Sequence, residues 1–253
     1  MLFFLMLPSM VFGQEGLDIR LDGYIRVEYA VRYNLRFDRG RLDRPYLGCL
    51  TIAGQASHFG MVPVKDTSAT GSADENEVFI GADTVMQVWK DLEHDRLVFM
   101  DLTLSGSPVP YDDTLHPMVW RLLPEQRMLE GIECHRAQTF FRGRTYVAWY
   151  APSIPVPHGP WKLGGLPGLV MEAFDVDRNL TFRLLSIHGQ EAAGVDIPPM
   201  PSGGIGDYAA YRAYWLGSFR RLRRSMAAQS EGGCLSCQTR TKVAFHTWER
   251  MAE

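Results

Sequence analysis

The residues whose type and spacing most directly permit chemistry are the four cysteines: Cys49, Cys134, Cys234 and Cys237. The last two form a Cys-Leu-Ser-Cys motif, whose thiols can form a disulfide, exchange disulfides or bind zinc. A thioredoxin-like site would place this motif at the start of a helix, whereas here it follows a predicted helix and Gly232-Gly233. For zinc, His246 would be a third ligand, but no further Cys or His pair completes a tetrahedral set. We therefore expect structural disulfides, Cys49 with Cys134 and Cys234 with Cys237, with redox or zinc chemistry at the second pair as the alternative.

Other motifs for catalysis are missing or incomplete in the sequence. It contains neither the G-x-S-x-G motif of serine hydrolases nor the H-E-x-x-H motif of zinc proteases. The stretch from Gly159 to Gly165 has the glycine spacing of a phosphate-binding loop, but Leu166 follows where that motif requires lysine. Asp112 and Asp113 are adjacent, and neighbours on a strand point to opposite faces, so they are a poor acid-base pair. The sequence predicts no catalytic residue, no metal site and no cofactor, and favours a protein that is not an enzyme.

Composition limits the class of protein. The chain has 253 residues, is 46% hydrophobic and carries a formal charge of −3, which is typical of one large globular domain or two small ones. Its apolar residues are too interrupted for a protein that crosses the membrane several times. The near-neutral charge argues against a general nucleic-acid binder. We expect partners other than nucleic acid and a mature chain that is not an integral membrane protein.

The N-terminus has the pattern of a secretory signal. Residues 1–12 read MLFFLMLPSMVF, and the first charge is Glu15. This run is too short to span a bilayer, and Val11 and Gly13 are small enough for the two specificity positions before a signal-peptidase cut. We predict a signal peptide over residues 1–13 and export to the periplasm or cell envelope; a plain hydrophobic N-terminus is the alternative.

Hydrophobic periodicity predicts a mainly β protein. From Ile25 to Phe37 every odd residue is apolar, which indicates a long strand with one buried face. Shorter runs of β type follow at residues 77–80, 85–89, 96–104, 135–141, 145–150, 169–175 and 180–187. Turn residues at 142–144 and 177–179 join neighbouring runs, so those strands must be antiparallel. Residues 66–76 are small and polar, and we interpret them as a surface loop. The sequence thus predicts an antiparallel sheet over residues 14–190, curved into a half-barrel.

The C-terminal part changes character. Residues 191–206 are rich in Pro and Gly and are interpreted as a connector. Residues 207–253 are predicted to form a helix capped by Asp207 and a tail that contains Cys234 and Cys237. The helix carries an apolar stripe from Tyr208 to Met226 and a group of four arginines at residues 220–224, near its expected C-terminal end, where cations offset the helix dipole. We expect it to pack on the sheet with a solvated basic face; a helix that binds an anionic membrane or a partner is the alternative.

The most unusual stretch is Gly159 to Val170, GPWKLGGLPGLV. Pro167 and Gly168 fit the central positions of a type II turn. Gly164 and Gly165 permit a close approach of the backbone to another strand or to a ligand. A structural corner that leads into a core strand is the interpretation that physical reasoning favours.

Residues 134–174 resemble the GLPGLI family, exported proteins mainly of Bacteroidetes. The matching pieces include Cys134, Arg142-Gly143-Arg144, Trp149-Tyr150, Gly159-Pro160-Trp161 and the motif Gly165 to Val170, which here ends in Val instead of Ile. The resemblance implies a signal peptide and a mostly antiparallel β domain, and it carries no catalytic residue. Because members are often encoded near outer-membrane TonB-dependent receptors, it also implies a partner in the envelope. The run from Trp120 to Cys134 is similar to the half-barrels of periplasmic lipoprotein carriers.

We predict an exported envelope protein that binds an apolar ligand, a peptide or a receptor partner without catalysis. A curved sheet with an apolar face makes a groove, and the aromatic and Gly-rich segment would line its rim. The predicted binding residues are Trp149, Tyr150, Trp161, Gly164, Gly165 and Leu166. Two alternatives remain: a redox protein or other enzyme that uses Cys234 and Cys237, and a structural or assembly protein.

Overall fold

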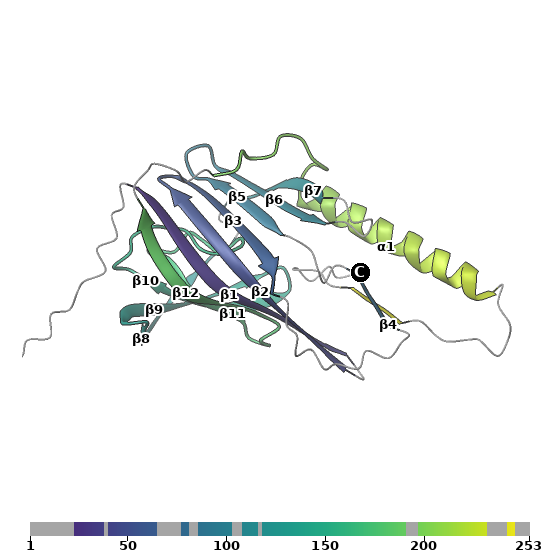
Figure 1. Cartoon of the computed structure of the whole chain (residues 1–253), viewed down its shortest axis with the longest axis horizontal. Coiled ribbons are helices and arrows are strands. Elements are labelled where there is room, and N and C mark those ends of the chain that lie inside the picture. The colour runs from purple at the N-terminus through teal and green to yellow at the C-terminus, as the bar shows by residue number, and fades with distance from the viewer. Residues whose placement is uncertain are drawn as a thin grey trace, which may run out of the picture.

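The computed structural model of the chain describes residues 23–37, 40–64, 77–80, 86–102, 108–115, 118–190, 197–231 and 242–245. Eleven strands form one sheet in the order β7-β6-β5-β3-β2-β1-β12-β11-β10-β9-β8, and every neighbouring pair is antiparallel (Figure 1). The bounds are β1 Tyr24–Phe37, β2 Gly40–Ala53, β3 Ala56–Pro63, β5 Gln87–Asp91, β6 Arg96–Leu102, β7 Pro108–Asp113, β8 Arg121–Leu129, β9 Ile132–Phe141, β10 Arg144–Ala151, β11 Leu169–Asp175 and β12 Leu180–Gln190. Strands β4 (Glu77–Ile80) and β13 (Lys242–Phe245) pair in parallel in a separate small sheet, and one helix, α1, spans Tyr208–Glu231. The prediction of a mainly β fold with an antiparallel sheet and a helix near the C-terminus is confirmed.

The central strand β1 has the alternating burial that its hydrophobic pattern predicts. Its odd residues from Ile25 to Tyr33 are buried, and it pairs with β2 on one side and β12 on the other. The predicted turn between β9 and β10 is confirmed, because Arg142 and Gly143 have φ values of 44° and 77°, as a tight two-residue hairpin turn requires. The turn between β11 and β12 is confirmed as well, with Arg178 at a φ of 57°.

One face of the sheet carries the hydrophobic core. Side chains of β1, β2, β3, β5, β6, β7, β9, β10, β11 and β12 contribute to it, and so does the segment between β10 and β11. That segment, residues 152–168, contains the Gly-rich stretch up to Gly168 and includes the buried residues Trp161, Leu163 and Leu166. We call it the Gly-rich loop. Its residues complete the core of the sheet.

The two edges of the sheet differ. Edge strand β7 is followed along its outer side by the irregular residues 204–206: Ile205 donates a hydrogen bond to the Pro110 carbonyl over 3.1 Å, and Asp112 donates to the Gly206 carbonyl over 2.9 Å. Gly204 lies so close that an added Cβ would be 2.3 Å from the Pro110 carbonyl oxygen. At the other end, β8 pairs with β9 alone among the described strands.

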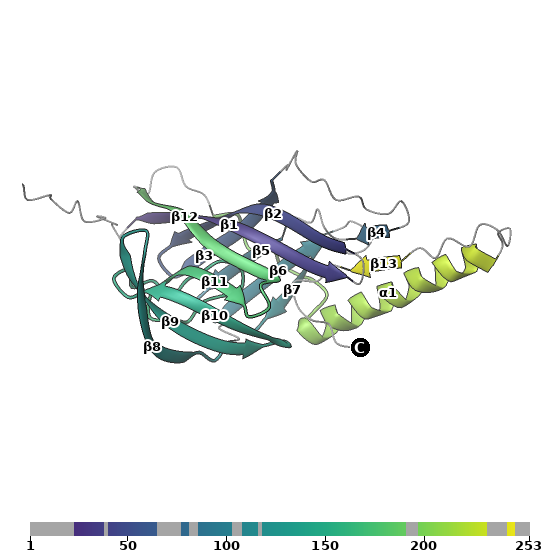
Figure 2. The same cartoon turned by 90° about the horizontal axis from the view of Figure 1, so that it is seen from below.

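Helix α1 begins where the sequence predicts. Asp207 caps it, since its carboxylate accepts a hydrogen bond of 2.9 Å from the backbone N–H of Ala210. The first turns pack on β7, where Tyr211 stacks on Tyr111 with ring centroids 4.3 Å apart, and Trp215 is buried. Beyond these turns the helix runs past the end of the sheet (Figure 2). It therefore packs on the sheet through its N-terminal part.

The described part of the helix extends to Glu231, further beyond the arginines than the sequence suggests. The four arginines at residues 220–224 consequently lie in its middle, and its last turn contains no basic residue. The helix dipole acts within about one turn of the end. The predicted role of these arginines in offsetting the dipole is therefore wrong.

Several predictions fall on residues outside the described ranges: the signal peptide at 1–13, the loop at 66–76, the first part of the connector, and Cys234, Cys237 and His246. They stay predictions, as do the domain boundaries. Within the part of the chain that the structure covers, no helix has both the length and the apolar character needed to cross a membrane.

Candidate functional site

The Gly-rich loop is closed at its base by backbone contacts. The N–H of Leu169 donates to the Ile154 carbonyl over 2.9 Å, and the N–H of Gly168 donates to the Leu166 carbonyl over 2.8 Å. This second bond spans two residues, as in a γ-turn, and Gly168 does not have the positive φ of a type II turn. The predicted type II turn is wrong. Glycine is required here for another reason, because an added Cβ would lie 2.2 Å from the Ala151 carbonyl oxygen.

Trp161 fixes the loop in the core. Its side chain has no exposed surface, its ring lies parallel to that of Phe182 within 13°, and its centroid is 5.8 Å from that of Tyr146. The backbone of Trp161 has a φ of 51°, which is uncommon for a residue other than glycine. The surrounding contacts must hold this conformation, because it costs energy by itself.

Lys90 of β5 forms hydrogen bonds with the backbone of the Gly-rich loop. Its Nζ atom donates to the carbonyl oxygens of Gly159 over 2.9 Å and Leu163 over 2.6 Å. Burial lowers the pKa of Lys90 to about 7, because a charged ammonium is poorly solvated in the core. The alternation of β5 places Lys90 on the same face as Val88, and a lysine at a core-facing position is the signal that sequence reasoning missed.

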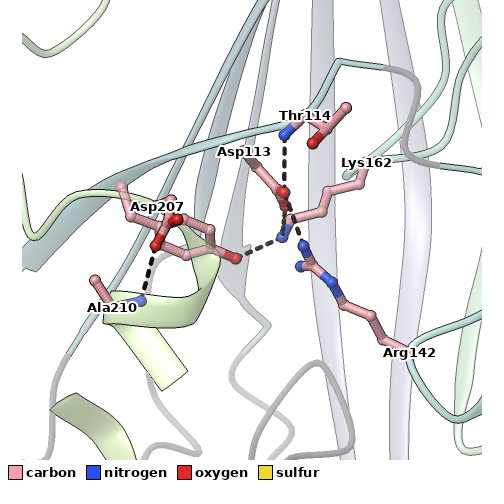
Figure 3. Close-up of polar contacts among 7 residues, drawn as sticks. Asp113, Thr114, Arg142, Lys162, Asp207 and Ala210 are labelled. Carbon is pink, nitrogen blue, oxygen red and sulfur yellow. Dashed lines mark hydrogen bonds and ion pairs between the residues drawn. The ribbon is translucent and has the colours of Figure 1, made fainter. Parts of the chain in front are cut away.

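A second buried lysine joins the loop to β7 (Figure 3). The Lys162 Nζ atom lies 2.6 Å from Asp113 Oδ2 and donates to the Tyr111 hydroxyl over 2.5 Å. Arg142, from the β9–β10 turn, approaches the other carboxylate oxygen, Oδ1, at 2.7 Å. We call Asp113, Lys162 and Arg142 the buried ion cluster. Burial by itself would raise the pKa of the Asp113 carboxyl, but the charges and hydrogen bonds of Lys162 and Arg142 outweigh it, so this pKa lies below its ordinary value.

The buried ion cluster also reaches helix α1. The Arg142 guanidinium lies over the Tyr208 ring at 3.2 Å from its centroid, and Tyr208 is the first residue of the helix. The Lys162 ammonium lies 4.5 Å from the Phe99 centroid. All three charges are thus paired or stacked on aromatic rings, an arrangement that positions the loop, β7 and α1 relative to one another. No group of three or more metal-binding side chains occurs within the described ranges.

The predicted binding residues separate into two groups. Tyr150, Trp161, Gly164 and Leu166 are buried, and Trp161, Gly164 and Leu166 lie together in the loop. Gly165 is exposed, and Trp149 is partly exposed on the opposite face of the sheet from Tyr150. Gly164 also accepts a hydrogen bond of 2.9 Å from the Trp120 indole N–H through its carbonyl oxygen.

Trp149 is the centre of a surface of arginine, aromatic and acidic side chains. Its cross-strand partners are Arg136 on β9 and Glu172 on β11, and directly opposite residues share one face. The Arg127 guanidinium lies 4.1 Å from the Trp149 ring centroid and forms an ion pair with Glu172. We call Arg127, Arg136, Trp149 and Glu172 the Trp149 surface. The salt bridge and the stacking hold its indole in place.

The structure does not support the predicted disulfide between Cys49 and Cys134. Both are free thiols, and four strands separate β2 from β9 in the sheet. Five strand spacings are about 24 Å along the sheet, whereas disulfide-bonded Cα atoms lie within about 7 Å. Burial raises the pKa of both thiols, that of Cys134 to about 11. Reactive cysteines have lowered pKa values, so neither thiol suits redox chemistry.

A family model matches residues 123–172. It is described as "Protein of unknown function (Porph_ging)", and the match runs from β8 into β11, so it includes the Gly-rich loop and the Trp149 surface. No curated protein sequence matches the chain significantly.

Solved structures provide distant similarities. PNGF-II, in two crystal forms, is 14% and 12% identical over 68% and 77% of this chain, with TM-scores of 0.43 and 0.48. The matches cover only 28% and 33% of PNGF-II, so this chain corresponds to about a third of that protein. A putative outer membrane lipoprotein-sorting protein domain from Vibrio parahaemolyticus is 7% identical over 69% of this chain and 87% of its own, with a TM-score of 0.32. No activity, substrate or partner follows for this chain from similarities of this size.

Proposed function

We propose that the protein is a non-catalytic binding protein of the cell envelope and that it binds a peptide or protein partner through the Trp149 surface. The observation that carries this proposal is the partial exposure of Trp149, whereas the aromatic and leucine side chains predicted beside it are buried. Tryptophan and arginine are the residues enriched in the energetic centres of protein interfaces. A TonB-dependent receptor, as the GLPGLI resemblance implies, is a partner of this kind.

An apolar ligand is the weaker alternative. Tyr150, Trp161 and Leu166, the large side chains predicted to line a groove, are in contact with the protein's own core. A ligand on that face would have to displace the Gly-rich loop and break the hydrogen bonds of Lys90. A partner at the Trp149 surface requires no such rearrangement.

In-cell photo-crosslinking tests the proposal. A photoreactive residue is placed at Arg136, beside Trp149, and the matched control carries it at Val62, an exposed residue of β3 far from Trp149 in the strand order. We expect one or more protein adducts from position 136, none from position 62, and loss of the adducts when Trp149→Ala is added. Adducts that persist in Trp149→Ala, or the same adducts from both positions, would show that the Trp149 surface is not the binding site.

The free edge of β8 favours assembly as a second candidate function. Its outer side pairs with no described strand, and an extended peptide or a second copy of the chain can add to such an edge. Pro124 and the register shift between Leu122 and Gln126 restrict this pairing to the end of the strand near Arg127. Met128→Pro should then abolish self-association measured by sedimentation; association that is unchanged would exclude the β8 edge.

A redox function would depend on Cys234 and Cys237, which lie outside the described residues. Labelling the native, unreduced protein with a thiol reagent tests it. Reaction at either residue would favour redox chemistry, and no reaction would favour a structural disulfide.

A further inference from the structure

The middle of helix α1 carries a concentrated positive charge. Arg220, Arg221, Arg223 and Arg224, which we call the arginine cluster, are all exposed. No acidic residue occurs in the helix before Glu231. The overall charge of −3 therefore conceals a strongly basic helix.

The arginine cluster has no structural role within the described residues. None of its four guanidinium groups forms an ion pair there; the contacts that they make are a hydrogen bond of 2.7 Å from Arg221 to the Ser218 hydroxyl and a distant approach of Arg223 to the Phe219 ring. Arginines three and four positions apart on a helix repel one another and destabilise it. The cluster also lies too far from the last turn to interact with the helix dipole.

The helix holds the cluster away from the sheet. Its first two turns are anchored by the stacking of Tyr211 on Tyr111 and by the burial of Trp215. Arg224 lies nine residues beyond Trp215, about 14 Å further along the axis at 1.5 Å per residue. Figures 1 and 2 both show this part of the helix projecting past the strands of the eleven-stranded sheet. The cluster is thus presented on an anchored projection.

The remaining side of the same turns carries the apolar residues Phe219 and Leu222, together with Ser218 and Ser225. At 100° per residue the four arginines occupy an arc of about 160°, and Phe219 and Leu222 lie on the rest of the circumference. These two side chains are partly exposed and do not belong to the hydrophobic core. A helix with a basic side and an apolar side suits the interface of an anionic bilayer, where both sides are used. An anionic bilayer supplies phosphates for the charges and an apolar boundary for these two side chains.

We propose that helix α1 binds the surface of an anionic lipid bilayer, with the arginine cluster on the lipid phosphates and with Phe219 and Leu222 at the headgroup boundary. Arginine suits this contact because its planar guanidinium forms paired hydrogen bonds with phosphate oxygens. The membrane contact is separate from the Trp149 surface, so each can fail without the other.

Sedimentation of the purified full chain with vesicles tests the inference. One set of vesicles contains phosphatidylcholine alone, and the other contains equal parts of phosphatidylcholine and phosphatidylglycerol. The test variant changes the four arginines of the cluster to Gln, which has a similar helix propensity. The matched control changes four exposed sheet arginines to Gln, so that the net charge falls equally: Arg26, Arg32, Arg121 and Arg183. The predicted signal peptide is the same in all samples.

We expect the wild type and the sheet variant to bind the anionic vesicles, and the cluster variant to bind them about tenfold or more weakly, since each basic residue near a charged surface adds to the attraction. Binding should also fall at high salt. Circular dichroism checks that the cluster variant folds; if it does not, Arg221→Gln with Arg224→Gln should give an intermediate loss. Equal binding by all variants, or no binding by the wild type, would overturn the proposal. Capture of an acidic protein that requires the cluster, without vesicle binding, would also overturn it and identify a protein partner.

Discussion

The buried ion cluster gives the sharpest prediction, the effect of Asp113→Asn on stability. The substitution keeps the shape of the side chain and removes the negative charge between Lys162 and Arg142. Both ion pairs are short, 2.6 Å and 2.7 Å, and the side chains of Lys162, Asp113 and Arg142 are 0%, 3% and 15% exposed. The variant would leave two cations facing an amide in the interior.

The expected cost follows from this geometry. Breaking a buried ion pair by removing one partner destabilises a protein by about 3–5 kcal/mol, because the remaining charge is neither solvated nor compensated. For a chain of this size that loss lowers the melting temperature by about 6–20 °C. Lys162 keeps the Tyr111 hydroxyl and Arg142 keeps the Tyr208 ring, so we expect the lower half of this range.

Asp112 provides the matched control. It is adjacent in sequence but points to the other face of the sheet, where it is 62% exposed and pairs with Arg96. Asp112→Asn should cost about 0–1 kcal/mol, as for other exposed pairs. Both variants are compared with the wild type by urea unfolding followed by tryptophan fluorescence. If the two substitutions differ by less than about 1 kcal/mol, the assignment of Asp113 as a buried counter-ion is wrong.

The pH dependence of Asp113→Asn is a second readout. The pKa of Asp113 is lower in the folded state than the ordinary value of about 4 that applies when the chain is unfolded. The unfolded state therefore takes up the proton first as the pH falls, and the stabilisation present above about pH 4 is lost as the pH falls through the folded-state pKa. The difference between wild type and variant should be constant near neutral pH and narrow below about pH 4.

Three further predictions concern the core. Because the pKa of Lys90 is lowered to about 7, the free energy of unfolding of the wild type should rise between about pH 7 and pH 10, by at most about 1.4 kcal/mol per pH unit. Urea unfolding of Lys90→Met should lack this rise. The same pH dependence in both proteins would contradict the low pKa. Gly168→Ala should lower the melting temperature strongly because its Cβ would overlap the Ala151 carbonyl. Gly60→Ala should have a small effect, because its Cβ meets only the His58 side chain, with the nearest atom at 3.3 Å. Equal melting temperatures would show that the base of the loop is not tightly packed. Cys134 should react with iodoacetamide at pH 8 only after unfolding, because it is buried and its pKa is raised to about 11. Mass spectrometry of the modified peptide measures the reaction. Rapid labelling of the folded protein would refute its burial.

Local features of the sequence were sufficient for many elements. The alternation from Ile25 to Phe37 predicted β1, the Arg-Gly-Arg segment predicted the β9–β10 hairpin, and Asp207 predicted the start of α1. Alternation also predicted that Asp112 and Asp113 point apart. These predictions succeed because backbone dihedrals, capping and side-chain alternation are decided within a few residues.

Strands with weaker local signals were missed. Strand β7 contains Pro108 and Pro110, which are unfavourable inside a sheet and are tolerated here at an edge strand. Strand β8 is exposed along most of its length and contains Pro124, so it lacks a buried face that would produce alternation. Strand β2 includes Pro45 and Gly48, which interrupt its pattern.

Local sequence patterns were sufficient to predict the β class, the turns, the cap of the helix and the unusual character of the Gly-rich loop. The folded chain was needed to show that the loop completes the core, that Trp149 is partly exposed, and that the arginine cluster lies in the middle of a projecting helix. The reason is that these features depend on contacts between distant residues: Lys90 and Leu163 are 73 positions apart, and Lys162 and Asp113 are 49 apart. Whether a lysine is buried, or a carboxylate is its partner, is determined by the packing of whole strands, which no local pattern contains.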